Sequence, residues 1–271
     1  MSRKVILVTG STDGIGKETA RRLAEQDHIV WVHGRNRQRA EQCAEELTAN
    51  TGNSDIRAVH GDFSSLKAVK KMSMDMMRQT EWLDVLINNA GMMTSFREYT
   101  IDRYEKTFQV NYLSPFLLTN ALLHLLRASQ QGRIIHVASM IHAKNIDFDN
   151  LTFNNSLDGQ EAYSATKLYN IVFSNKLARL LQGNAVTSNS LHPGVINTKL
   201  LRQHYGSIGQ PVSQGAETSV YLATEPGVAR HSGKYFVNSH LATPAKAALD
   251  REVQDKLWDR TLPLVSNYLD Q

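Results

Sequence analysis

The feature that most constrains the fold is a regular alternation of short apolar runs with longer amphipathic stretches. Apolar runs of strand length lie at residues 5–8, 29–32, 56–60, 84–88, 133–138 and 186–191. The stretches between them are long enough for helices, and strands that alternate with helices form a parallel sheet covered on both faces. The sequence therefore predicts one α/β domain over residues 1–271, built on a doubly wound parallel sheet of about seven strands.

A glycine-rich turn joins the first predicted strand to the first predicted helix. Its sequence is Thr9-Gly-Ser-Thr-Asp-Gly-Ile-Gly16, and an amphipathic pattern follows at once. Backbone N–H groups at a helix start bind phosphate, and glycine lets a ligand approach the backbone closely. The spacing is Gly-x-x-x-Gly-x-Gly, not the commoner Gly-x-Gly-x-x-Gly. The turn predicts a dinucleotide site of the Rossmann type, formed by Gly10, Ser11, Thr12, Asp13, Gly14, Ile15 and Gly16.

The end of the second predicted strand bears on the choice between NADP and NAD. This strand continues into His33-Gly34-Arg35-Asn36, with no acidic residue to bind the ribose hydroxyls of NAD. Arg35 can bind a 2′-phosphate through a forked, charge-assisted contact. Arg39 is a second candidate, and an arginine that faces only water is the alternative interpretation. We expect NADP(H) as the favoured cofactor, with Arg35 and Asn36 at the ribose, and NAD(H) as the second choice.

Other predicted strands also end in polar residues or glycines. Ligands of such sheets collect at the carboxyl ends of the strands. We therefore expect one shared edge to hold the residues at these ends, namely Asp62, Phe63, Asn89, Ala90, Gly91, Ser139, Pro193 and Gly194.

A tyrosine and a lysine four residues apart, Tyr163 and Lys167, project from one face of a predicted helix. A phenol titrates near pH ~10, and a nearby ammonium favours the phenolate and lowers that pKa. The hydroxyl of Ser139 could polarise a carbonyl oxygen while Tyr163 exchanges its proton. The same spacing is common on solvated helix faces. It indicates a catalytic site only in combination with the polar residues expected at the strand ends.

Composition narrows the class of protein. Of the 271 residues, 41% are hydrophobic and 21% are charged, as in ordinary soluble globular proteins. The net charge is only +4 and no basic tract is interleaved with aromatics, so we expect no nucleic-acid partner. Cys43 is the only cysteine and the histidines lack ligand spacing, which predicts no metal site and a cytoplasmic location. The run at 5–8 is too short for a membrane span, so we expect no membrane anchor.

In their order along the chain, these motifs resemble those of short-chain dehydrogenases/reductases. The matches are Thr-Gly-x-x-x-Gly-x-Gly at 9–16, Asn-Asn-Ala-Gly at 88–91, Asn111, Ser139, Tyr-x-x-x-Lys at 163–167 and Pro-Gly at 193–194. The stretch between Ser139 and Tyr163 is longer than is usual in that family. With the sequences at 162–168 and 256–259, it resembles the branch that contains retinol dehydrogenases and the WW-domain oxidoreductase. Unlike membrane-bound retinol dehydrogenases, this chain is expected to lack an N-terminal anchor.

The resemblance implies a catalytic tetrad. Tyr163 would be the general acid or base, and Ser139 would orient the carbonyl. Lys167 would hold the nicotinamide ribose and lower the tyrosine pKa, while Asn111 would position a water in a proton relay.

The resemblance also implies cofactor contacts. Asp62 and Phe63 would contact the adenine, and Asn89, Ala90 and Gly91 would line the cofactor. Pro193, Gly194, Val195 and Thr198 would lie at its nicotinamide end. NADP-preferring relatives often carry a basic residue where this chain has Asp13, so the preference for NADP rests mainly on Arg35.

The expected substrate wall is apolar and has no basic group among its members to bind a carboxylate. We predict that its residues are Met93, Ser139, Met140, His142, Leu200 and Leu201. A loop over about 195–213 would close over the site. A C-terminal helix over about 245–260 would dock on the body of the protein or on a second subunit of a homo-oligomer.

The expected function is hydride transfer between NADP(H) and a neutral, largely apolar alcohol, aldehyde or ketone. One alternative is a non-catalytic NADP(H)-binding redox sensor, although such proteins can lose the tyrosine or lysine that this chain keeps. Another is an enzyme similar to protochlorophyllide reductase. That family uses cysteines near its pigment, whereas Cys43 lies in the second predicted helix.

Overall fold

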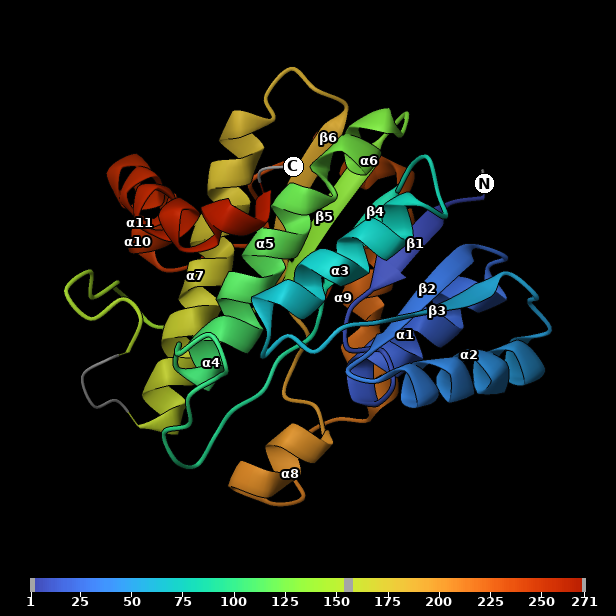
Figure 1. The fold of residues 1–271 in the computed structure, drawn as a ribbon, viewed down its shortest axis with the longest axis horizontal. Helices are drawn as coiled ribbons and strands as arrows, with labels where there is room; N and C mark the ends of the chain where they lie inside the picture. Colours follow the sequence, from blue (N-terminus) through green and yellow to red (C-terminus); the bar gives the residue numbers. More distant parts are fainter. Residues whose placement is uncertain (1–2, 154–157, 270–271) are drawn as a thin grey trace.

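Eight strands form one sheet in the computed structural model, which describes residues 3–153 and 158–269 (Figure 1). Their spatial order is β3-β2-β1-β4-β5-β6-β7-β8, and every neighbouring pair except β7 and β8 is parallel. The strand order reverses between β1 and β4, which is where such sheets bind their ligands. The strands are β1 (Val5–Val8), β2 (Ile29–Gly34), β3 (Ile56–His60), β4 (Val85–Asn88), β5 (Gly132–Val137), β6 (Val186–His192), β7 (Tyr235–Val237) and β8 (His240–Ala242).

Helices cover both faces of this sheet, and the strands are buried on both sides. Along β1, Ile6 and Val8 pack into the core on one face, while Val5 and Leu7 pack into the core on the other. The first core holds α1 (Gly14–Glu25), α2 (Arg37–Thr51) and α9 (Val212–Thr224); the second holds α3 (Leu66–Met77), α5 (Ser114–Ala121) and α7 (Gly159–Leu180). The predicted doubly wound α/β fold is confirmed. The difference is the short antiparallel strand β8 at the edge.

Shorter elements complete the chain. The helical stretch that begins at Ser114 is divided at Leu122, where the backbone leaves the helical region. No helix in the described residues has both the length and the apolarity to cross a bilayer. The remaining elements are α4 (Lys106–Phe108), a π-helical turn (Gln109–Leu113), α6 (Leu123–Ala128), α8 (Lys199–Tyr205), a 3₁₀ turn (Pro226–Arg230), α10 (Lys246–Leu249) and α11 (Arg251–Leu269).

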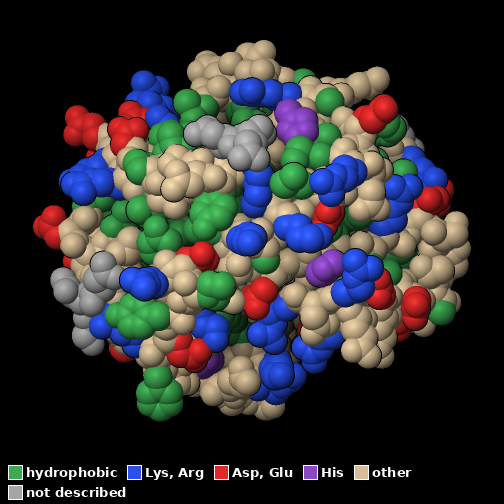
Figure 2. Space-filling model, viewed as in Figure 1, with side chains coloured by type: hydrophobic (Ala, Val, Ile, Leu, Met, Phe, Trp, Pro, Cys, Tyr) green, Lys and Arg blue, Asp and Glu red, His purple; other side chains and the backbone are tan. Residues whose placement is uncertain are grey.

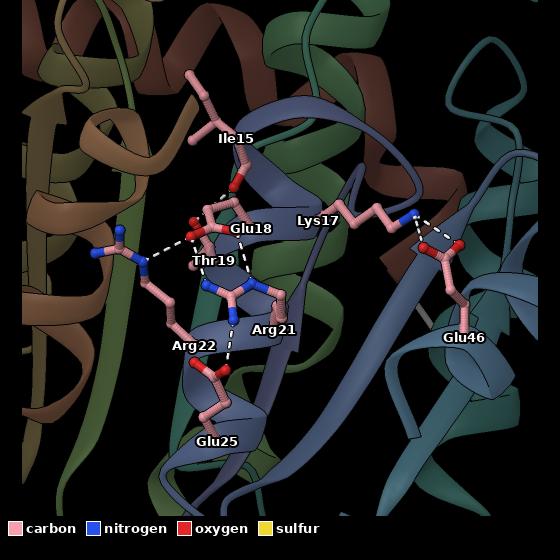
Figure 3. Close-up of polar contacts among 8 residues, drawn as sticks. All are labelled: Ile15, Lys17, Glu18, Thr19, Arg21, Arg22, Glu25 and Glu46. Atoms are coloured by element: carbon pink, nitrogen blue, oxygen red, sulfur yellow. Dashed lines mark hydrogen bonds and ion pairs between the residues drawn. The ribbon is translucent and has the colours of Figure 1, made fainter. Parts of the chain in front are cut away.

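Ion pairs along α1 support the helix that carries the glycine-rich turn (Figure 3). Glu18 accepts hydrogen bonds from Arg21 and Arg22, one helical turn further on. Lys17 reaches across to Glu46 of α2, with Nζ 2.7 Å from Oε1. Surface pairs of this kind contribute at most about 1 kcal/mol each, and of these only the Lys17–Glu46 pair joins the two helices.

The C-terminal helix α11 packs on α7, α5 and α3 of the same chain, and Figure 1 shows it beside α7. Leu257 is 1% exposed, and the ring of Trp258 lies 5.1 Å from that of Phe116, centroid to centroid. The hydroxyls of Tyr112 and Thr261 are hydrogen-bonded at 2.8 Å. The sequence left open whether this helix docks on the body of the protein or on a second subunit. In the structure it docks on the body of the protein. The helix expected at about 245–260 is built as α10 and α11, and α11 continues to Leu269.

Candidate active site

The three glycines of the turn after β1 differ in what surrounds them. A Cβ atom at Gly10 would lie 2.8 Å from the Cα of Ala90, and one at Gly16 would lie 2.4 Å from Asn89 Nδ2. Packing of this turn against the turn after β4 therefore requires both glycines. Gly14 has φ +55°, and a Cβ there would meet only the Thr198 Cγ2, at 3.7 Å. The backbone at Gly14 thus faces open space beside Thr198, as a phosphate-binding turn requires.

Asn89 and Ala90 hold this turn in place. Asn89 Nδ2 donates to the carbonyl oxygen of Thr9 at 2.8 Å. The hydroxyl of Thr9 accepts from the backbone N–H groups of both Asn89 and Ala90, each at 3.0 Å. The polar groups that the sequence placed against the cofactor are therefore used to join the ends of β1 and β4. Thr9, the first residue of the glycine-rich motif, thus supports the site although no cofactor contact was predicted for it.

A buried histidine, His33, was also missed, although it stands at the end of β2 directly before a glycine. Its Nδ1 accepts from Gly10 N at 2.9 Å, and its Nε2 lies 2.9 Å from the carbonyl oxygen of Gly61. Burial lowers the pKa of His33 to about 4, so the ring is neutral near pH 7. Since Nδ1 is an acceptor, the proton is on Nε2, which donates to Gly61. The ring also stacks on Phe63 and so joins the ends of β1, β2 and β3.

Several residues predicted to bind the cofactor have local backbone partners. Asp13 accepts from Gly14 N at 2.7 Å and caps α1, and Asn36 caps α2 by accepting from Arg39 N at 2.9 Å. Asp62 accepts from Ser64 N at 2.9 Å. Arg35, directly after β2, is exposed and takes part in none of the ion pairs found among the described residues. Its guanidinium is thus available to an anionic ligand at this edge.

Tyr163, Lys167 and Ser139 meet at the carboxyl end of β5. The Ser139 side chain lies close enough to the Tyr163 hydroxyl to lower its pKa, and Lys167 Nζ lies 5.3 Å from the centroid of the tyrosine ring. Lys167 Nζ also donates to the carbonyl oxygen of Val137 at 2.9 Å. Burial lowers the pKa of Lys167 to about 8. The structure therefore brings together three of the four predicted catalytic side chains.

The expected lowering of the tyrosine pKa is corrected by the structure. Burial raises the pKa of Tyr163 to about 12, although the neighbouring side chain of Ser139 acts in the opposite direction. The lysine does not reverse this, because its ammonium faces the ring and is held by Val137. Tyr163 consequently keeps its proton near neutral pH.

Asn111, the fourth predicted catalytic residue, lies in the π-helical turn. Its Oδ1 accepts from Met92 N at 2.8 Å, and its Nδ2 donates to the Met92 carbonyl oxygen at 2.9 Å and to Thr166 Oγ1 at 3.2 Å. The side chain thus ties the loop after β4 to α7. A Cβ at Gly91 would lie 3.4 Å from Lys167 Nζ and 3.6 Å from Asn111 Oδ1, so Gly91 leaves the approach to both side chains open.

Hydrogen bonds with Tyr235 and His142 hold the segment that begins at Ser139 in place. The Ser139 carbonyl oxygen accepts from the hydroxyl of Tyr235 at 3.2 Å and from His142 Nδ1 at 2.6 Å. His142 Nε2 in turn accepts from Ala245 N at 3.0 Å. Because both ring nitrogens of His142 bind backbone groups, the geometry favours a structural link over the predicted substrate contact. Tyr235, on the short strand β7, has no motif that could have revealed it.

The segment that contains α8 lies at the lower edge of the molecule in Figure 1. Thr198 caps α8, accepting from Leu201 N at 3.2 Å. His204 Nε2 lies 3.2 Å from the carbonyl oxygen of Met93, which links α8 to the loop after β4. Leu200 and Leu201 are half-buried, whereas Val195 is 44% and Met140 57% exposed. The predicted substrate wall therefore combines half-buried and exposed apolar side chains.

Exposed hydrophobic side chains project from this same lower edge, where the loop between β4 and α4 runs (Figures 1 and 2). Within that loop, Phe96 is 82% and Ile101 77% exposed.

The described residues contain no group of three or more His, Cys, Asp or Glu side chains placed to hold a metal ion.

Comparison with known proteins agrees with this architecture. Human retinol dehydrogenase 13 is 38% identical over 97% of this chain and 84% of its own length. Human retinol dehydrogenase 14 is 36% identical over 96% and 85%. Among solved structures, a protein from Mycobacterium paratuberculosis described as uncharacterized superposes with a TM-score of 0.82 at 24% identity, covering 98% of this chain and 94% of that one. The complex of Pseudomonas aeruginosa RhlG with NADP has a TM-score of 0.72 at 24% identity, covering 88% and 95%.

The protein-family model described as short chain dehydrogenase matches residues 4–206 of this chain. These residues include the glycine-rich turn, Ser139, Tyr163 and Lys167. With relatives more than 30% identical over nearly the whole chain, this match shows that the protein belongs to the short-chain dehydrogenase family.

Proposed function

We propose that this protein is an NADP(H)-dependent oxidoreductase that interconverts a neutral, largely apolar alcohol with its aldehyde or ketone. Family membership makes it an oxidoreductase acting on CH–OH groups. The observation that carries the proposal is the meeting of Tyr163, Ser139 and Lys167 at the carboxyl end of β5.

The protonation state of Tyr163 suits carbonyl reduction. Its pKa, raised to about 12, keeps the phenolic proton in place near pH 7, beside the side chain of Ser139. A carbonyl oxygen bound between the two hydroxyls would accept hydrogen bonds from both and take up the tyrosine proton. In the direction of oxidation, the phenol would first have to release its proton to solvent, and the phenolate would then receive the proton of the alcohol.

The residues at the strand ends fit a dinucleotide. The open space at Gly14 and the missing side chain at Gly91 leave room along the edge of the sheet. An ammonium has three N–H donors, and the hydrogen bond described for Lys167 Nζ, to Val137, uses one of them. The others suit the ribose hydroxyls. When bound, the nicotinamide supplies or accepts the hydride, and the protein supplies the geometry.

The preference for NADP over NAD rests on Arg35. Its exposed guanidinium stands at the end of β2, where a 2′-phosphate would lie. The RhlG structure of the same fold is described with NADP bound. Asp13, in the turn between β1 and α1, carries a negative charge, but its carboxylate accepts a hydrogen bond from Gly14 N and caps α1.

The wall around the reacting groups supports an apolar substrate. Met93, Leu200 and Leu201 are apolar and half-buried, and Met140 is apolar and exposed beside Ser139. Desolvating an unpaired carboxylate against such a wall would be costly. The relatives named retinol dehydrogenases suggest a long apolar alcohol such as retinol as one substrate to test.

Tyr163→Phe provides the direct test. This variant keeps the ring but lacks the proton, so turnover of NADPH with an apolar aldehyde should fall roughly 10²- to 10⁴-fold. Cofactor affinity, followed by fluorescence titration with NADPH, should remain close to that of wild type. Retention of more than about a tenth of the activity would contradict the role of Tyr163.

A further inference from the structure

A cavity of about 450 Å³ lies between the segment that follows β6 and the first turns of α9. The segment His192–Ile196 forms one side of it, and α9 with the end of β7 forms the other. The segment and the start of α9 are held together because Gln210 N donates to the Val195 carbonyl oxygen at 2.8 Å. The cavity walls are thus fixed by backbone contacts.

One side of this cavity lies beside the segment that carries Ser139. Met140, which lines the cavity, directly follows Ser139, and its backbone N–H donates to His192 Nδ1 at 3.1 Å. Its side chain and that of Val195 are apolar and substantially exposed. A substrate whose carbonyl group lies at Ser139 could therefore extend past Met140 into the cavity.

The side formed by α9 is polar and carries a single acidic group. Gln214, Glu217 and Thr218 project from the first two turns of this helix, and Asn238 follows β7. Among the described residues, Glu217 takes part in no ion pair, and the cavity lining contains no Lys or Arg. His192 adds no positive charge near pH 7, because burial lowers its pKa to about 4. Acceptor oxygens and a negative charge therefore face any ligand here.

We propose that this cavity receives the end of the substrate that is remote from the carbonyl group, and that it selects a substrate ending in a hydroxyl group over one ending in a carboxylate. This inference rests on the proposed function and sharpens its substrate class to an apolar molecule with a hydrogen-bond donor at its far end. Glu217 is the acceptor, and the amides of Gln210 and Gln214 are its neighbours in the lining. A carboxylate would meet the like charge of the exposed Glu217, and the lining offers no cation to pair with it.

The test uses matched aldehydes. Benzaldehydes carry, opposite the aldehyde, a side chain of increasing length that ends in methyl, hydroxyl or carboxylate, and kcat/KM is measured with NADPH. At the length that reaches α9, the hydroxyl compound should exceed the methyl compound by roughly fivefold to tenfold, the worth of one hydrogen bond. Glu217→Leu should remove this preference and Glu217→Gln should retain part of it. Glu45→Leu, an exposed glutamate on α2 outside the cavity, serves as the control.

The outcomes separate this proposal from the proposed function. Turnover of the methyl compounds without any preference for hydroxyl, or a preference that survives Glu217→Leu, would refute the cavity assignment while leaving the reaction intact. Absence of turnover with every aldehyde would count against the proposed function. In that case, saturation-transfer NMR with the corresponding alcohols that lack the aldehyde tests the cavity directly. Binding weakened by Glu217→Leu but not by Glu45→Leu supports the cavity, and absence of binding refutes it.

Discussion

Lys167→Met should make the protein more stable while removing its activity. The lysine side chain is 4% exposed, and burial lowers its pKa from 10.5 to about 8. Each pKa unit corresponds to about 1.4 kcal/mol, so the charged ammonium costs the folded state roughly 3 kcal/mol near neutral pH. Methionine has a similar length and no charge. Loss of the hydrogen bond to Val137 offsets about 1 kcal/mol, which leaves a net gain of roughly 2 kcal/mol.

The lowered pKa of Lys167 also sets the pH window of this effect. Between about pH 8 and pH 10.5, the unfolded chain binds a proton at this lysine more readily than the folded chain does. The free energy of unfolding of the wild type therefore rises with pH across this window. The variant lacks the ammonium group. Its excess free energy of unfolding over the wild type is therefore greatest below pH 8 and disappears as the pH approaches 10.5.

Urea unfolding followed by circular dichroism, without added cofactor, measures this advantage at neutral pH and near the upper end of the window. Lys176→Met, on the same helix, is the control. Its Nζ lies 2.5 Å from Asp255 Oδ1, so its replacement should lower stability or leave it unchanged. The reasoning fails if Lys167→Met is less stable than the wild type at neutral pH, or if the difference between them does not change with pH.

Three further predictions follow from the cofactor edge and the C-terminal helix. Arg35→Ala should weaken NADPH binding roughly ten- to a hundredfold and leave NADH binding nearly unchanged, as measured by fluorescence titration; equal losses for both cofactors would refute the role of Arg35. Gly14→Ala should cost about 1–2 kcal/mol of stability but abolish cofactor binding, whereas Gly16→Ala should fail to fold stably, since its Cβ would lie 2.4 Å from Asn89 Nδ2. Leu257→Ala should lower the free energy of unfolding by about 2–5 kcal/mol in urea titrations, and an effect below about 1 kcal/mol would show that α11 is not integral to the core.

The strands and the face-covering helices could be predicted because each is specified locally. The predicted strand at 5–8 coincides with β1, and the one at 186–191 differs from β6 by a single residue. The β7–β8 hairpin could not be predicted with equal ease. Its strands are three residues long, and its turn places Asn238 and Ser239 at φ +49° and +62°. Asparagine tolerates that conformation, but the pair lacks the glycine that marks such turns most clearly.

The candidate catalytic residues could be predicted from motifs, whereas the residues that hold them in position could not. Tyr163 and Lys167 follow from their spacing on one helix. Whether the lysine lowers the tyrosine pKa depends on burial and on the orientation of its ammonium, which spacing does not encode. His33 and Tyr235 act through contacts between strands that are far apart in the sequence, and a single sequence carries no signal for such pairings.

The position of α11 has a consequence for folding during synthesis. This helix follows every other described element in the chain, yet it covers α5 and α7 with Trp258 against Phe116 and Phe173. While the chain is being translated, the aromatic surface of these two helices stays uncovered until α11 has left the ribosome. Nascent chains that stall before α11 would therefore expose a hydrophobic surface suited to chaperone binding and prone to aggregation.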